Sequence, residues 1–134
     1  MLTVYTSNSS LAFSHVSATY DFPENGKDPW EQMKFVDEVV DFMHKMGDGY
    51  NTSINTFSPY ILNYLNLLLM RGDLSADELK VSECYFDAEN YGDITEHNLM
   101  INREVRQIVD TRVLSEPISW IYQEYNKLKD EKER

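Results

Sequence analysis

Polar side chains follow two segments that have the composition of β-strands. Asp21 and Glu24 come just after residues 16–20, and Ser58 comes just after residues 52–57. Apolar side chains recur at helical spacing between the two segments, so the order is that of a strand, a helix and a parallel strand. Ligands of such sheets bind at the carboxyl ends of the strands. We therefore expect any chemistry of this chain at residues 21–24 and 57–58.

The carboxylates of Asp21 and Glu24 offer hard oxygen ligands of the kind that divalent cations bind. Two carboxylates in a loop are far more often solvated or used as helix caps, and we favour this interpretation over a metal site. The three histidines are dispersed in the sequence, which favours structural or surface roles for them. They are His15, His44 and His97.

Two helices are expected to position these segments. The first has Asp28 as its N-cap and Pro29 as its first residue, and the second has Ser58 and Pro59 in the same places. A glycine ends each helix. The apolar positions of the first helix are Trp30, Met33, Val36, Val39, Val40, Met43 and Met46. Those of the second, which should be buried on more than one side, are Ile61, Leu62, Tyr64, Leu65, Leu68 and Leu69.

The rest of the chain indicates more strands and one more helix. The other strand-like segments are residues 2–6, 81–86, 94–101 and 105–109, the last three as an antiparallel meander. A final helix is expected from near Ser115, with residues 127–134 as its charged end. We predict one α/β domain over residues 1–134, with parallel core strands in a two- or three-layer arrangement, a C-terminal meander and a terminal helix.

The residues from Asp21 to Gln32 have the spacing of an ATPase motif. They read D-F-P-E-N-G-K-D-P-W-E-Q, which resembles the E-E-P-E-x-x-L-x-P-x-x-Q motif of predicted ATPases related to the SMC and OLD proteins, within the ABC class of P-loop ATPases. In that family the first acid belongs to the Walker B motif and the second polarises the attacking water. Five defining positions are kept or conservatively replaced, namely Asp21, Pro23, Glu24, Pro29 and Gln32. Lys27 replaces the leucine, and Phe22 occupies the place of the catalytic acid.

Residues 55–62 carry a second likeness to the same family. They read N-T-F-S-P-Y-I-L and resemble the motif T-T-H-S-P-Y-L-L, in which the histidine contacts the γ-phosphate. Thr56 and Ser58 match that motif, and Phe57 replaces the histidine. The order of the two motifs and the helix between them also match the family, and the resemblance covers about residues 16–71.

The resemblance implies a nucleotide site that has lost its chemistry. The five glycines, at 26, 47, 49, 72 and 92, leave no G-x-x-x-x-G-K-[ST] phosphate loop. Phosphoryl transfer needs positioned donors around the phosphates and a group that orients water, and a phenyl ring supplies neither. We therefore predict no catalytic residue and no cofactor. The degenerate nucleotide-site positions are Asp21, Phe22, Glu24, Gln32, Thr56, Phe57 and Ser58.

The composition restricts the kinds of partner that this chain is expected to bind and the cell compartment in which it is expected. With 12 basic and 23 acidic residues the net charge is −11, which disfavours direct binding to nucleic acid or to anionic membranes. Cys84 is the only cysteine, so a disulfide within the chain is excluded and a buried, inert thiol is expected. No export signal or long apolar segment is present, which predicts a cytoplasmic protein.

Several aromatic residues lie at helical spacing. Such stripes usually belong to a core, and exposed members would mark a contact surface instead, because Tyr and Trp are enriched at binding hot spots. We predict burial for Tyr60, Tyr64, Trp120, Tyr122 and Tyr125.

Three functions are compatible with these patterns. The first is a non-catalytic, ATPase-like domain, a pseudoenzyme that acts through contacts with an unidentified protein or with a second copy. The second is the C-terminal fragment of a larger active ATPase whose Walker A motif lies upstream, which an in-frame phosphate loop before Met1 would reveal. The third is a small metal- or nucleotide-binding regulator that uses Asp21 and Glu24.

Two structural expectations follow from the motif alignment. Phe22 and Phe57 should lie close together at the carboxyl ends of adjacent parallel strands. In related ATPases the strand that matches residues 52–57 lies between the Walker B strand and the phosphate-loop strand, and the latter is missing here. An open edge promotes aggregation, so we expect residues 2–6 or 81–86 to fill the place, with pairing to another chain as the less favoured solution.

Overall fold

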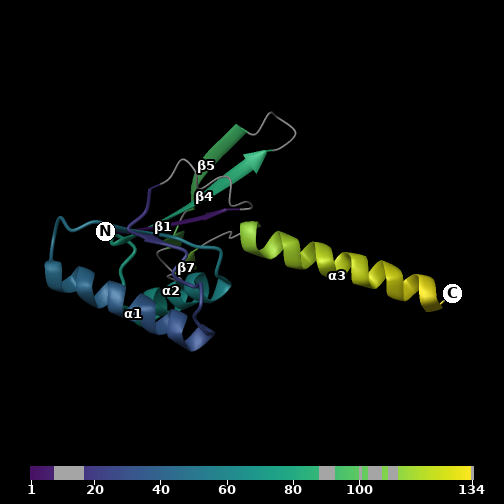
Figure 1. Cartoon of the computed structure of the whole chain (residues 1–134), viewed down its shortest axis with the longest axis horizontal. Helices are drawn as coiled ribbons and strands as arrows, with labels where there is room; N and C mark the ends of the chain where they lie inside the picture. The colour runs from purple at the N-terminus through teal and green to yellow at the C-terminus, as the bar shows by residue number, and fades with distance from the viewer. Residues whose placement is uncertain (8–16, 88–92, 100, 103–106, 109–111, 134) are drawn as a thin grey trace.

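The computed structural model describes residues 1–7, 17–87, 93–99, 101–102, 107–108 and 112–133. Strands and helices alternate along the first part of the chain, and a long helix closes it (Figure 1). The elements are β1 (Leu2–Ser7), β2 (Tyr20–Asp21), α1 (Pro29–Met46), β3 (Thr52–Asn55), α2 (Pro59–Arg71), β4 (Leu79–Asp87), β5 (Asp93–Leu99), β6 (Ile101–Asn102), β7 (Gln107–Ile108) and α3 (Arg112–Glu133).

A five-stranded sheet with the order β2-β3-β1-β4-β5 forms the centre of the molecule. The first four of these strands run parallel, and β5 pairs antiparallel with β4. The predicted α/β fold with parallel core strands is confirmed. The expected meander is only partly right, because β4 and β5 form a hairpin whereas β6 and β7 form a separate two-stranded ribbon.

Strand β1 fills the place next to β3. Thr3, Val4 and Tyr5 pair with Ser53, Ile54 and Asn55 on one side of β3, and β2 pairs on its other side. Strand β1 also pairs with β4 over its whole length, from Leu2 to Ser7. The prediction that one of the chain's own segments, residues 2–6 or 81–86, fills this position is therefore confirmed, and the segment is residues 2–6.

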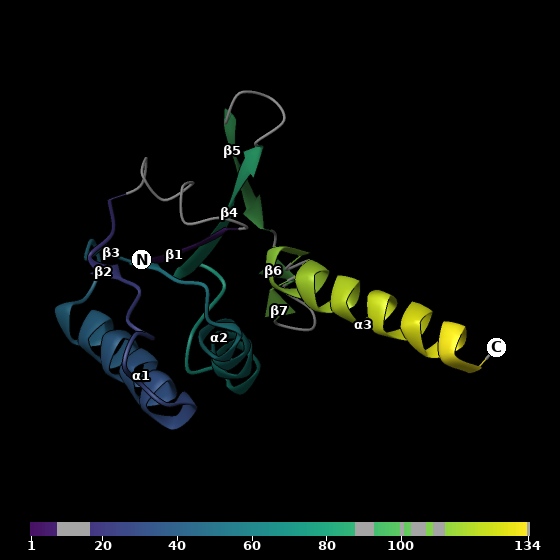
Figure 2. The same cartoon turned by 45° about the vertical axis from the view of Figure 1, so that its right-hand side comes forward.

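Both α1 and α2 lie side by side against one face of the sheet (Figures 1 and 2). The strands supply alternate residues to this face, because successive side chains of a strand point to opposite sides. The arrangement of the described elements is thus two-layered. The core between the layers includes Leu2, Val4, Val36, Val40, Ile54, Ile61, Leu65 and Val81.

The caps of α1 and α2 are those predicted from the sequence. The Asp28 carboxylate accepts a hydrogen bond from the Glu31 N–H at 2.8 Å, and the Glu31 carboxylate accepts from the Asp28 N–H, which completes a capping box. The Glu31 N–H also lowers the pKa of Asp28. At α2 the Ser58 hydroxyl accepts from the Ile61 N–H at 3.3 Å, and Gly72 ends the helix with a left-handed φ of 82°.

Helix α3 begins at Arg112, before the expected start, and projects away from the sheet (Figure 2). Burial of the aromatic residues was wrongly predicted for Trp120, Tyr122 and Tyr125, which are 62%, 64% and 62% exposed, and for Tyr60, which is 51% exposed. Tyr64 is half-buried. Helical spacing places side chains on a common face, but a face is buried only where another element covers it.

Among the helices within the described residues, none combines the length and the hydrophobicity that a membrane-spanning segment requires.

Candidate functional site

The structure brings the two sequence motifs together at the carboxyl ends of β2 and β3. Asp21 is paired with Asn55 in the parallel ladder, and the Phe22 N–H donates to the Asn55 carbonyl at 2.8 Å. All seven predicted site residues lie in this region or in the first turns of α1 and α2. This is the place where the parallel topology predicts a ligand site.

Phe22 and Phe57 form a stacked pair at this edge. Their ring centroids lie 5.4 Å apart with an interplanar angle of 9°, which confirms the predicted proximity. Both side chains are half-buried. Phe22 has a φ of 48°, the one positive value recorded for a non-glycine residue in the described chain. A bulky residue rarely adopts this conformation, so the surrounding contacts hold Phe22 against the local preference of its backbone.

Glu24 ties the loop after β2 to the junction of β3 and α2. Its Oε1 accepts a hydrogen bond from the Thr56 hydroxyl at 2.8 Å, and its Oε2 accepts from the Phe57 N–H at 2.8 Å. The Thr56 hydroxyl in turn accepts from the Ser58 N–H at 2.9 Å. Both carboxylate oxygens of Glu24 therefore already serve as acceptors within the protein.

Asp21 has a different environment, although it stands only three residues before Glu24. Its side chain is exposed, and Oδ1 accepts a hydrogen bond from Asn55 Nδ2 at 2.8 Å. Asp21 is thus the more accessible of the two acids at the end of the parallel strands.

Gln32 has a structural role that reaches two other segments. Its side-chain Nε2 donates to the Lys27 carbonyl at 3.1 Å, and its Oε1 accepts from the Ser58 hydroxyl. Gln32 and Ser58 are 7% and 5% exposed, so both side chains are shielded from water. Gln32 thereby fixes the loop before α1 to the cap of α2.

Lys27 does not point into the space between the two motifs. Its Nζ donates to the Pro23 carbonyl at 2.9 Å and lies 5.5 Å from the centroid of the Phe35 ring, in a cation–π geometry. The charge that could attract a phosphate group is therefore engaged within its own loop and against α1.

Together these contacts form a hydrogen-bonded corner between β2 and β3, beside the stacked rings of Phe22 and Phe57. The side chains of Glu24, Thr56, Ser58 and Gln32 bind one another or nearby backbone groups, and phenyl rings occupy the two positions that the motif resemblance compares with an acid and a histidine. Within the described parts of the chain, no cluster of three His, Cys, Asp or Glu side chains is placed to bind a metal ion. Asp21 and Glu24 have separate hydrogen-bond partners, which gives no support to a shared cation between them.

Sequence reasoning missed the part played by Asn55, which is 1% exposed and holds Asp21. Its place at the end of a strand, one residue before Thr56, was the available signal. Buried Glu83, 3% exposed and paired in register with Thr6, was also missed. Nothing in the local sequence distinguishes Glu83 from an exposed strand residue. Cys84 is buried, as predicted.

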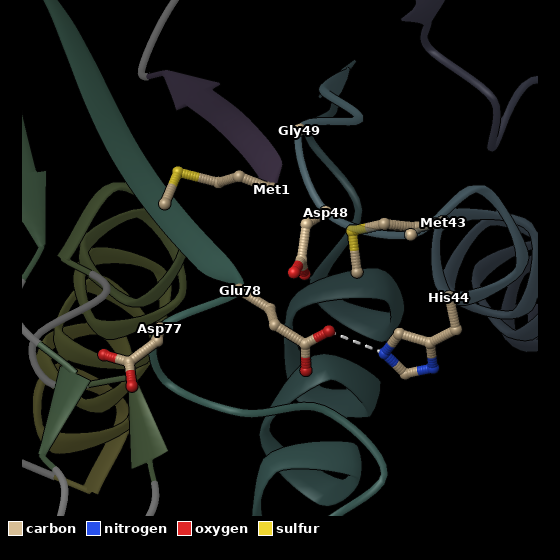
Figure 3. Close-up of a pocket in the computed structure, with 8 residues that line it drawn as sticks. Met1, Met43, His44, Asp48, Gly49, Asp77 and Glu78 are labelled. Atoms are coloured by element: carbon tan, nitrogen blue, oxygen red, sulfur yellow. Dashed lines mark hydrogen bonds and ion pairs between the residues drawn. The ribbon is translucent and has the colours of Figure 1, made fainter.

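A cavity of about 430 Å³ lies at the opposite, amino ends of the strands (Figure 3). Met1, Gly49 and Glu78 line it just before β1, β3 and β4 begin. Two residues that line the cavity form a hydrogen-bonded pair, with His44 Nε2 at 2.7 Å from Glu78 Oε2. Burial alone would raise the pKa of Glu78, but hydrogen bonds from the Ser75 N–H and from His44 outweigh it and lower the pKa. The cavity contains none of the predicted site residues.

No protein-family model, curated protein or solved structure is found to be similar to this chain. The motif resemblance therefore stays a prediction that rests on the residues themselves.

Proposed function

We propose that this chain is a non-catalytic, ATPase-like domain that acts through protein contacts. The stacking of Phe22 on Phe57 carries this proposal, because it puts two apolar rings at the strand ends where a nucleotide-hydrolysing relative needs an acid and a histidine. Neither ring can orient water or donate to a phosphate oxygen. On this basis the corner at β2 and β3 is a structural element that has replaced a reaction site.

The bonding of Glu24 supports the same conclusion. A carboxylate that accepts from the Thr56 hydroxyl and the Phe57 N–H uses its oxygens to hold the corner together. Binding of Mg²⁺ through this group would require those hydrogen bonds to be given up, and each hydrogen bond to a charged acceptor contributes about 1.5–3 kcal/mol. The regulator that binds metal through Asp21 and Glu24 is thus the least supported alternative.

The position of β1 argues against the alternative that this chain is a fragment of a larger, active ATPase. A phosphate-loop strand from an upstream segment would pair with β3, but β1 already occupies that side of β3 and pairs with β4 as well. Such a strand could enter only by displacing β1. Residues 8–16, which follow β1 at the end where a phosphate loop would begin, contain no glycine and no lysine. These features favour the pseudoenzyme over an active fragment.

The net charge and the exposed aromatic residues of the chain indicate the kind of partner that such a domain contacts. We infer a cytoplasmic protein that contacts other proteins, and the net charge of −11 disfavours direct binding to nucleic acid or to an anionic membrane. Exposed aromatic side chains on α2 and α3, including Tyr60 and Trp120, suit contact surfaces because such residues dominate binding energies.

A phosphate-release assay on the purified chain with Mg-ATP tests the proposal. We expect release at the rate of the buffer alone, for the chain and for an Asp21→Ala variant. Turnover by the chain that Asp21→Ala abolishes would show an intact Walker B function and would refute the pseudoenzyme. The Asp21 side chain is exposed, so the variant leaves the hydrophobic core in place, but it removes the hydrogen bond from Asn55 Nδ2, and its fold is therefore checked by circular dichroism.

A further inference from the structure

Helix α3 carries an apolar stripe that no described element covers. Ile121, Tyr125 and Leu128 are 57%, 62% and 58% exposed. The helix leaves the body near its first residues and extends freely (Figures 1 and 2). At 1.5 Å per residue its 22 residues span about 33 Å. Large apolar side chains that stay exposed along a helix of this length indicate a contact surface.

The stripe has the spacing of a coiled-coil seam. Ile121, Tyr125, Leu128 and Lys132 follow one another at intervals of four, three and four residues, which is the a/d pattern of a heptad with Ile121 and Leu128 at d. A lysine at a single a position, as at Lys132, specifies the number of helices at some cost in stability. The seam is therefore suited to a two-stranded assembly.

The two flanks of the seam carry opposite charge. Glu124 and Glu131 occupy the g positions on one side, and Lys129 occupies an e position on the other. In a parallel pair each g residue faces the e residue of the next heptad of the partner, so Glu124 meets Lys129 of the partner subunit twice. In an antiparallel pair g residues face g residues, which would set glutamates against glutamates. The charge pattern thus matches a second copy in parallel orientation.

We propose that α3 is a self-association surface through which two copies of this chain form a parallel, two-stranded coiled coil. In the single chain Glu124 accepts from Lys127 at 3.2 Å, an exposed pair that contributes little and can be exchanged. The seam is short, so the dimer is a weak one that dissociates on dilution. This inference does not depend on the nucleotide-site argument, and its failure would leave the expected lack of ATP turnover unaffected.

Sedimentation equilibrium of the full chain tests the association. The measurement runs from roughly 1 µM to roughly 1 mM, in about 0.15 M salt to screen the repulsion between the acidic bodies. We expect a monomer–dimer equilibrium with a micromolar Kd. A Tyr125→Glu variant should weaken it by about tenfold or more, since it places a charge in the seam. A chain that stays monomeric at the highest concentration would overturn the proposal.

Trp120→Glu is the matched control for Tyr125→Glu. Both residues are aromatic and 62% exposed, but Trp120 lies about 140° around the helix from Tyr125. We expect the Trp120→Glu variant to dimerise like the unmodified chain. Equal loss of dimer in the two variants would show that general hydrophobicity, and not the seam, drives association.

Cross-linking and charge exchange test the orientation. A Leu128→Cys variant should form a disulfide-linked dimer on mild oxidation, because parallel helices bring the two d positions together, while the unmodified chain with buried Cys84 should not. Glu124→Lys alone should weaken the dimer, and adding Lys129→Glu should restore it. A dimer that neither cross-links through position 128 nor recovers in the double variant would contradict the parallel arrangement.

Discussion

Replacing Phe22 separates two effects that the structure assigns to this residue. Its ring stacks on Phe57, with 5.4 Å between the centroids, which stabilises the corner. Its backbone has a φ of 48°, a left-handed conformation that costs a residue with a Cβ atom about 1–2 kcal/mol. Phe22→Ala removes the ring and keeps the unfavourable backbone, whereas Phe22→Gly removes both.

The expected magnitudes follow from the burial of the ring. Removing a fully buried phenylalanine ring costs about 3–5 kcal/mol, and because Phe22 is half-buried we expect about 2 kcal/mol for Phe22→Ala. Phe22→Gly should be more stable than Phe22→Ala by about 1 kcal/mol, the reverse of the usual order of these residues. In a double-mutant cycle with Phe57→Ala, the coupling energy should be about 0.5–1.5 kcal/mol.

Urea denaturation followed by circular dichroism measures these free energies of unfolding. Trp30→Ala serves as the control, since Trp30 is 79% exposed and its loss should leave the unfolding midpoint unchanged. A glycine variant less stable than the alanine variant would refute the strained backbone at Phe22. Strictly additive losses at Phe22 and Phe57 would refute the stacking contact.

Three further perturbations test the parts around this corner. Glu24→Ala should lower the free energy of unfolding by about 2 kcal/mol, because Thr56 and the backbone lose a charged acceptor, while Glu24→Gln, which keeps one acceptor, should cost less than half of that by urea denaturation. Ser58→Ala should cost about 1–2 kcal/mol and speed amide exchange in the first turn of α2, so unchanged exchange would argue against the cap. The pKa of Glu78 is lowered by folding, so its ionised form stabilises the protein above about pH 4.5 and that contribution is lost as the pH falls through the folded value. The unmodified chain should therefore lose stability on acidification more steeply than Glu78→Gln, and parallel pH profiles would contradict the lowered pKa that the Ser75 N–H and His44 give to Glu78.

Local signals in the sequence predicted the starts of α1 and α2 well, but the strand predicted over residues 16–20 was wrong, because residues 17–19 are not in a strand and β2 comprises only Tyr20–Asp21. Asp28 with Pro29 and Ser58 with Pro59 fix the starts of α1 and α2, since a cap depends on residues within one turn. The parallel order of β2 and β3 followed from the strand–helix–strand pattern. Internal pairing beside β3 was also predictable, because an open central strand must find a partner, but the sequence left residues 2–6 and 81–86 as equal candidates for it.

Features that depend on distant packing were not accessible from the sequence. Helical spacing could not show that Tyr122 and Tyr125 have no covering layer, because that depends on where α3 leaves the body. The left-handed backbone of Phe22 and the hydrogen bond from the Phe57 N–H to Glu24 arise from the path of the loop between β2 and α1. The pairing of β4 with β1 likewise joins segments far apart in the chain.

Under the proposed function the corner between β2 and β3 does not bind nucleotide. Calorimetric titration of the chain with Mg-ATP is the direct test. The stacked Phe22 and Phe57 rings and the internally bonded Glu24 predict no heat beyond that of dilution, for the chain and for the Asp21→Ala variant alike. Micromolar binding by the chain that the Asp21→Ala variant loses would show a working nucleotide site and would contradict the proposed function.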